Sequence, residues 1–136
     1  MNNGNQIDLG TKVKLAKLAY LWCVSNLKKS KYHNDVPRLI VRSSKNNSRY
    51  KGYYKDNKNI IVIFPKNHRS ILDICETIIH EWKHYQQNIS GMYDKYIVLY
   101  RRNIKNHPYE ITAENFAKKH ANECRKFINR ENKIKK

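Results

Sequence analysis

The sequence predicts an α+β fold formed by one domain over residues 1–136. Three observations predict it. A chain of 136 residues is long enough for a single hydrophobic core, three short β-rich runs follow one another, and patterns with helical spacing flank them on both sides. The hydrophobic share of 40%, with ten Tyr and two Trp, excludes a disordered chain despite the high charge.

The first expected element is an amphipathic helix that begins at Thr11 and ends near Lys29. Its apolar residues recur with helical spacing, and Lys12, Lys14 and Lys17 fall on the outward side. Thr is a residue type that caps helix N-termini, because its hydroxyl accepts a hydrogen bond from a free backbone amide of the first turn.

Three β-rich runs come next, at Arg38–Arg42, Tyr50–Tyr54 and Asn59–Phe64. Segments of turn composition separate them, so the simplest arrangement is a three-stranded meander in which each strand lies beside the next. Pro65 ends the last strand.

A second helix is expected from Ser70 to about Asn88. Ser70 and Asp73 have the spacing of a capping box, in which the hydroxyl and the carboxylate bind free amides of the first turn. A third helix runs from Pro108 to about Asn129, because Pro suits the first turn of a helix. The C-terminal segment from about Arg125 is densely basic and overlaps the end of this helix; we expect it to be a frayed tail.

The formal net charge of +17 is compatible with a polyanionic partner such as nucleic acid. However, the sequence has 20 Lys against 8 Arg, and 17 Asn, a skew that an AT-rich genome also produces. Both explanations of the charge therefore stay open.

Cys23, Cys75 and Cys124 lie far apart in apolar helical stretches and form no CxxC pair, so we expect buried core residues rather than disulfides or ligands. No apolar run reaches the length of a membrane span, and the N-terminus has no recognisable secretory signal. We expect no membrane partner and a cytoplasmic location, or carriage inside a larger particle.

The second helix carries the sequence HEWKH, an HExxH motif formed by His80, Glu81 and His84. At 100° per residue all three project from one face, together with Asp73 and Thr77. Two imidazoles one turn apart can bind a single Zn²⁺ at about 2.0–2.1 Å. Glu81 then lies beside the metal, where it can take a proton from a zinc-activated water and deliver it to a leaving amine. This arrangement indicates a metal-assisted peptide hydrolase.

A catalytic zinc also needs a third protein ligand and one open position. Glu110, in the first turn of the third helix, fits that role, with Glu114 one turn further on. Ala117 and Ala121 are small enough for this helix to approach the HExxH helix closely. The structural alternatives are a solvated helix face that holds two His, a Glu110 that interacts only with the helix dipole, and a Glu114 that is only a surface charge.

HEWKH, followed 26 residues later by the E-x-x-A-E of Glu110 to Glu114, resembles the gluzincin group of zincin metallopeptidases. The resemblance is to small single-domain bacterial and phage proteins of the ImmA/IrrE and SprT-like kinds, over about Asn59 to Ala121. It implies a minimal zincin-like fold with one Zn²⁺ per chain, bound by His80, His84 and Glu110, and Glu81 as general base. Glu114 would take the position of the acid that orients a ligand His. The strand Asn59–Phe64 would be an edge that pairs with an extended peptide.

Some residues depart from related patterns. Gln87 stands where metzincins require Gly, which excludes that branch. SprT-like proteins commonly use a third His, which leaves His107, and less favourably His120, as the alternative third ligand. Candidates for stabilising an oxyanion are Tyr100, His107 and Tyr109. The two remaining histidines, His33 and His68, are interpreted as loop residues.

Two functions are therefore expected. The first is a zinc-dependent metallopeptidase acting on a protein or peptide substrate. The alternative is a zincin-fold binding or structural protein with little or no proteolytic activity, associated with nucleic acid or part of a larger assembly such as a phage particle. A protease held on nucleic acid by its basic surface and tail would combine both.

Overall fold

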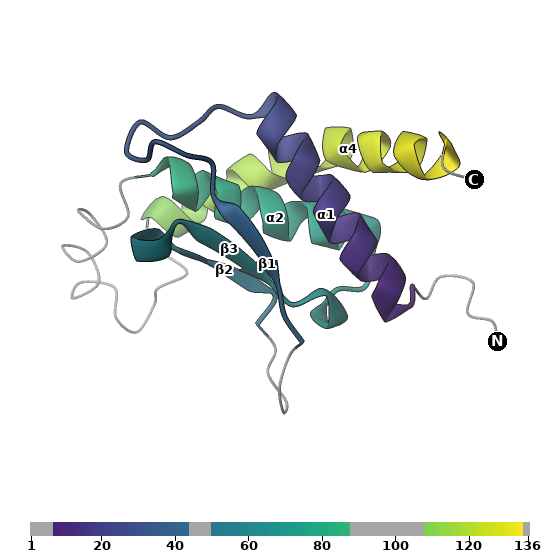
Figure 1. The fold of residues 1–136 in the computed structure, drawn as a ribbon. Coiled ribbons are helices and arrows are strands. Elements are labelled where there is room, and N and C mark those ends of the chain that lie inside the picture. Colours follow the sequence, from purple (N-terminus) through teal and green to yellow (C-terminus); the bar gives the residue numbers. More distant parts are fainter. Residues whose placement is uncertain (1–6, 44–49, 88–107, 135–136) are drawn as a thin grey trace.

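The computed structural model describes residues 7–43, 50–87 and 108–134, which form an α+β fold (Figure 1). Its helices are α1 (Leu9–Asn26), α2 (Ile71–Gln86) and α4 (Pro108–Ile134). Its strands are β1 (Arg38–Val41), β2 (Gly52–Lys55) and β3 (Ile60–Ile63). A short 3₁₀ turn at Asp56–Lys58 lies between β2 and β3, and another at Pro65–Asn67 lies between β3 and α2. The expected class and the order of helix, three strands and two helices are confirmed.

The expected meander is wrong. The sheet order is β1-β3-β2, with β1 parallel to β3 and β2 antiparallel to β3. All four residues of β3 are buried, whereas exposed and half-buried residues alternate along β2. A strand that is apolar at every position is best placed in the centre of a sheet, and an alternating strand tolerates an edge.

The strand order also corrects the expectation about which strand forms the edge that pairs with a peptide. The run Asn59–Phe64 contains β3, which is paired on both sides and cannot accept a further strand. Among the described residues, the free edges of the sheet belong to β1 and β2. Asn59 lies at the β2–β3 connection in the left-handed region, with φ of 51°, a conformation that Asn tolerates better than most residues.

Helix α2 is the central element of the fold. It contacts α1, α4, β2 and β3, and its contact with α4 is the most extensive between any two described elements. Figure 1 shows α1 crossing in front of the other two helices, and the sheet below α2 in this view. Residues at the centre of α2, such as Ile78, Ile79 and Trp82, are fully buried. Any functional group on α2 is therefore held by rigid packing.

The helix caps agree only in part with the sequence. Ser70 caps α2 as expected, because its Oγ accepts from the Asp73 backbone N–H at 3.1 Å. Asp8, not Thr11, caps α1: the Asp8 carboxylate accepts from the Thr11 N–H at 2.7 Å. A carboxylate is the better acceptor for the free amides at a helix start. Helix α1 also ends at Asn26, three residues before the expected end.

The basic segment after Arg125 is helical, not a frayed tail. Helix α4 continues to Ile134, five residues past the expected end. Cys124 and Ile128 are fully buried in the core, so the apolar stripe of α4 continues through the basic segment and anchors it.

The cysteines are confirmed as core residues, since Cys23, Cys75 and Cys124 are all buried and free. Across the three described segments, none of the helices has both the length and the apolar character required to cross a membrane.

Candidate metal centre

The centre is built on the polar face of α2. His80 and His84 lie one turn apart on this face, and their rings are 4.8 Å apart between centroids. Glu110 comes from the first turn of α4. Along the line where α2 and α4 meet, α4 presents the buried residues Ala113, Ala117 and Ala121, which let the two helices approach closely, as the sequence predicted.

The three expected ligands meet at one point. Glu110 Oε1 lies 3.0 Å from His80 Nε2, and Glu110 Oε2 lies 2.9 Å from His84 Nε2. One ligand atom from each residue can be chosen so that all lie within 4.8 Å of one another, and this group can hold a metal ion. Ligand atoms on a tetrahedral zinc at about 2.0 Å lie about 3.3 Å apart, so small side-chain shifts are enough to bind an ion.

Gln87 orients one of the imidazoles. Its Nε2 donates to the Tyr109 carbonyl at 3.2 Å, so its Oε1 faces His84 Nδ1 at 2.8 Å and acts as acceptor. His84 Nδ1 therefore carries a hydrogen, and Nε2 of the neutral ring points its lone pair at Glu110. A lone pair and a carboxylate oxygen 2.9 Å apart need a positive centre between them, which a proton or a metal ion supplies. The donor set of two imidazoles and one carboxylate therefore fits a metal ion.

The charges of the group reinforce one another. Burial alone would raise the pKa of Glu110, but its hydrogen bonds with His80 and His84 outweigh burial and hold that pKa well below its ordinary value. Burial opposes the charged form of His84, yet the contacts with Glu110 and the nearby Glu81 raise its pKa overall. Glu110 is thus a carboxylate at neutral pH, the form that binds a metal.

Glu81 lies next to this group in a protected position. Its side chain is only 8% exposed. Burial raises its pKa above the ordinary value, although both neighbouring histidines and a hydrogen bond from the Tyr54 backbone on β2 lower it in part. A raised pKa brings a carboxyl group closer to the range in which it can both accept a proton and return it.

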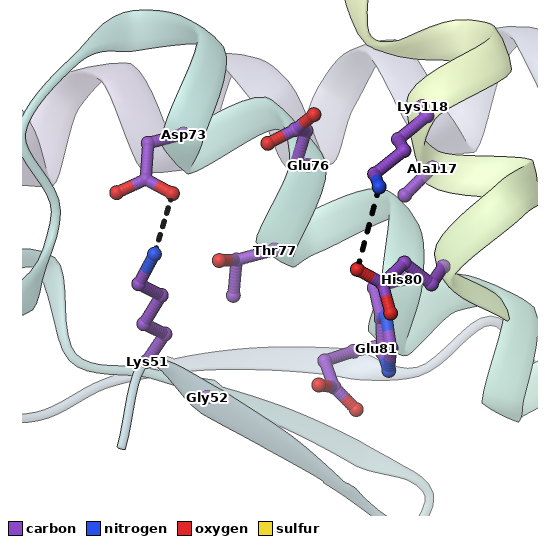
Figure 2. A pocket seen from close by; sticks show the side chains of 10 residues that line it. Lys51, Gly52, Asp73, Glu76, Thr77, His80, Glu81, Ala117 and Lys118 are labelled. Carbon is purple, nitrogen blue, oxygen red and sulfur yellow. Dashed lines mark hydrogen bonds and ion pairs between the residues drawn. The ribbon is translucent and has the colours of Figure 1, made fainter. Parts of the chain in front are cut away.

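A cavity of about 260 Å³ opens beside the ligands (Figure 2). Figure 2 shows Lys51 and Asp73 at one end and His80 and Glu81 at the other, with Lys118 and Ala117 of α4 forming a wall. Its lining contains Lys51, Gly52, Asp73, Glu76, Thr77, His80, Glu81, Glu114, Ala117 and Lys118. Four of these residues are acidic in a chain with only 11 Asp+Glu. This local excess of carboxylates favours the approach of a divalent cation.

The free edge of β2 borders the same cavity. The Phe64 N–H donates to the Lys51 carbonyl, and in an antiparallel ladder the pairs alternate, so the backbone groups of Gly52 and Tyr54 point away from β3. One of these groups, the Tyr54 backbone N–H, donates a hydrogen bond to the Glu81 carboxylate. Gly52 also needs to lack a side chain, because a Cβ there would lie 2.7 Å from the Val62 carbonyl oxygen.

Glu114 and His120, which the sequence also indicated as site residues, do not belong to the metal-binding group. Glu114 lines the cavity and forms an exposed ion pair with Lys118 at 3.6 Å, while the hydrogen bond to His84 Nδ1 comes from Gln87 instead. His120 packs its ring against Phe116, with centroids 4.5 Å apart, and is not in the metal-binding group. His107 and Tyr100 lie outside the described residues, as does Asn88, the expected end of the second helix.

Two residues of the site were missed in the sequence. Gln87 was considered only as a departure from the Gly of metzincins, although a Gln three residues after His84 can reach its ring. His68 was interpreted as a loop residue, but it is buried and bridges the Phe64 carbonyl, 3.0 Å from Nδ1, and Thr77 Oγ1, 2.8 Å from Nε2. It thereby ties the segment before α2 to the cavity wall. His33 is half-buried and contacts Asp56 and Tyr54, each at 3.0 Å.

Comparisons with protein-family models, with curated proteins and with solved structures gave no match to this chain.

Proposed function

We propose that the protein is a zinc-dependent metallopeptidase with a minimal zincin-like fold. The observation that carries the proposal is the meeting of His80, His84 and Glu110 from two helices, with the buried Glu81 beside them. Two imidazoles and one carboxylate leave a fourth position open on a tetrahedral zinc, which is the property of catalytic sites. The similarity of the motif to ImmA/IrrE and SprT-like proteins supports the same class.

Each residue of the site then has a definite role. His80, His84 and Glu110 would hold one Zn²⁺ per chain, with Gln87 fixing the ring of His84. Bound zinc would supply a Lewis acid that polarises a peptide carbonyl and lowers the pKa of water. Glu81 accepts a proton from the attacking water and delivers it to the leaving amine, since its raised pKa suits both steps.

We expect a peptide substrate to lie along the free edge of β2. The outward-facing backbone groups of Gly52 can pair with an extended chain, and this edge borders the cavity that ends at His80 and Glu81. In this proposal β2, rather than the run Asn59–Phe64, is the strand that pairs with the peptide.

Three proteins test the proposal: the wild type, Glu81→Gln and Glu110→Ala. Elemental analysis of the purified wild type should give one zinc per chain, and Glu110→Ala should lose it. Glu81→Gln should keep the zinc and the circular dichroism spectrum but cleave an unfolded protein substrate about 10²–10⁴-fold more slowly. Glu123→Gln, an exposed acid of α4, is the matched control and should behave as the wild type.

Different outcomes point in different directions. A wild type that neither contains nor rebinds metal would contradict the metal site. Zinc retained by Glu110→Ala would transfer the third-ligand role to His107. Zinc present without any cleavage would favour the alternative function, a binding or structural protein in a larger assembly such as a phage particle.

A further inference from the structure

The outer face of α4 carries a line of cationic side chains. Taking 100° per residue, they fall within an arc of about 140°, opposite the buried stripe of the helix. We call this set the α4 basic face; its members are Lys118, Lys119, Arg125, Lys126 and Arg130. All of them are exposed except Arg125, which is half-buried. The face is about 18 Å long, at 1.5 Å per residue.

The face is rigid because its helix is part of the core. Ala121, Cys124 and Ile128, on the other side of the same turns, are 0–1% exposed. The C-terminal turns, yellow in Figure 1, end at one extremity of the molecule. A preformed surface binds a partner without the entropic cost of ordering a flexible tail.

Little in the protein neutralises these cations. Lys118 and Lys126 form ion pairs of 3.6 Å with Glu114 and Glu123, but all four side chains are more than 60% exposed, so solvent screens both pairs. Within the described segments, Lys119, Arg125 and Arg130 have no ion-pair partner. Like charges on one helix face oppose each other, so the arrangement is not explained by helix stability.

Amides occupy the centre of the face. Asn115, Asn122 and Asn129 are exposed and recur every seven residues, so they form a row between the cationic side chains. Asn donates to phosphate oxygens and can form two hydrogen bonds with the edge of adenine. Phe116 and Phe127 of the same helix lie outside the arc of the face, and both are half-buried.

We propose that the α4 basic face binds duplex DNA. A helix of about 10–12 Å diameter fits the major groove of B-form DNA, which is about 12 Å wide, whereas the major groove of duplex RNA is too narrow. Single strands are bound mainly by stacking on exposed aromatic rings, which this face lacks. The net charge of +17 brings the partner near, and the face determines where it binds.

The test compares two variants with equal loss of charge. The first, Lys119→Gln/Arg125→Gln/Arg130→Gln, removes the unpaired cations of the face. The matched control, Lys55→Gln/Lys58→Gln/Lys66→Gln, removes three exposed cations from the sheet side of the molecule. Fluorescence anisotropy with a labelled 20-base-pair DNA of arbitrary sequence is measured from 50 to 200 mM salt.

We expect the face variant to bind at least about tenfold more weakly at 100 mM salt. Its plot of log affinity against log salt should be shallower by about 2.7, because each lost phosphate contact removes about 0.9. The control variant should differ little from the wild type. His80→Ala should bind DNA as the wild type does, which separates this surface from the metal site. Melting curves for all variants check that the fold is intact.

Several results would overturn the proposal. Equal losses in the two triple variants would mean that only the net charge matters. Displacement of the DNA by polyglutamate at an equal concentration of charge would indicate a general polyanion surface. Tighter binding of duplex RNA or single-stranded DNA would contradict the fit to the B-form groove.

Discussion

Gln87 is the residue whose replacement tests the geometry of the metal centre most directly. Its side chain holds the ring of His84 and bridges to the Tyr109 carbonyl at the start of α4. In Gln87→Ala both hydrogen bonds are lost, and His84, only 6% exposed, is left with a buried Nδ1–H that has no acceptor. Loss of such an outer partner weakens metal binding by about 10–100-fold, or about 1.4–2.7 kcal/mol.

The assay is a zinc titration in competition with a chromogenic chelator. Gln86→Ala is the matched control, because Gln86 is the neighbouring glutamine and donates to the Lys28 carbonyl at 2.7 Å, away from the metal centre. Gln87→Glu keeps an acceptor for His84 and should lose less affinity than Gln87→Ala. If Gln87→Ala binds zinc within twofold of the wild type, or if Gln86→Ala weakens binding as much, the orienting role is refuted.

Two further predictions concern stability. Gly52→Ala places a Cβ 2.7 Å from the Val62 carbonyl oxygen, so urea unfolding should show a loss of about 1–3 kcal/mol, whereas Gly10→Ala, 3.5 Å from its nearest neighbour, should lose nothing. Equal losses would contradict the close approach. Burial lowers the pKa of His68 below 6.5, so its stabilising contribution is complete above pH 6.5 and declines as the pH falls below it. With metal chelated, the unfolding free energy of the wild type relative to that of His68→Gln should therefore fall between pH 6.5 and 5 by up to about 1.4 kcal/mol per pH unit. The difference is the quantity to measure, because Glu81, whose raised pKa acts in the opposite direction, is present in both proteins. An equal pH dependence of the two proteins would argue against this role of His68.

The parts of the site that depend on local sequence were predictable. The cap at Ser70 and the common face of His80, Glu81 and His84 follow from helical spacing alone. Glu110 was found because its position at the start of a helix with small residues allows a close approach to α2. These features depend on residues a few positions apart, or on one strong motif.

The parts of the fold that depend on pairing between residues far apart in the sequence were not predictable. The order β1-β3-β2 requires β1 to pair with a strand that is not its neighbour in sequence, and turn composition carries no information about that choice. The signal available in the sequence for a central strand was the run of four consecutive apolar residues in β3, all of which are buried. Likewise, the helical end of α4 depends on Cys124 and Ile128 reaching the core, a tertiary contact that overrides the polar composition of the segment.

Because the candidate ligands come from both α2 and α4, the zinc of the proposed function would be a crosslink between the two described helices with the most extensive contact. An ion that binds only the folded chain adds its binding free energy to the stability of the whole domain, about 2.7 kcal/mol at a free concentration 100 times the dissociation constant. The melting temperature of the protein would then depend on the concentration of free zinc around it. The lifetime of the chain and the occupancy of its metal centre would be controlled by the same concentration.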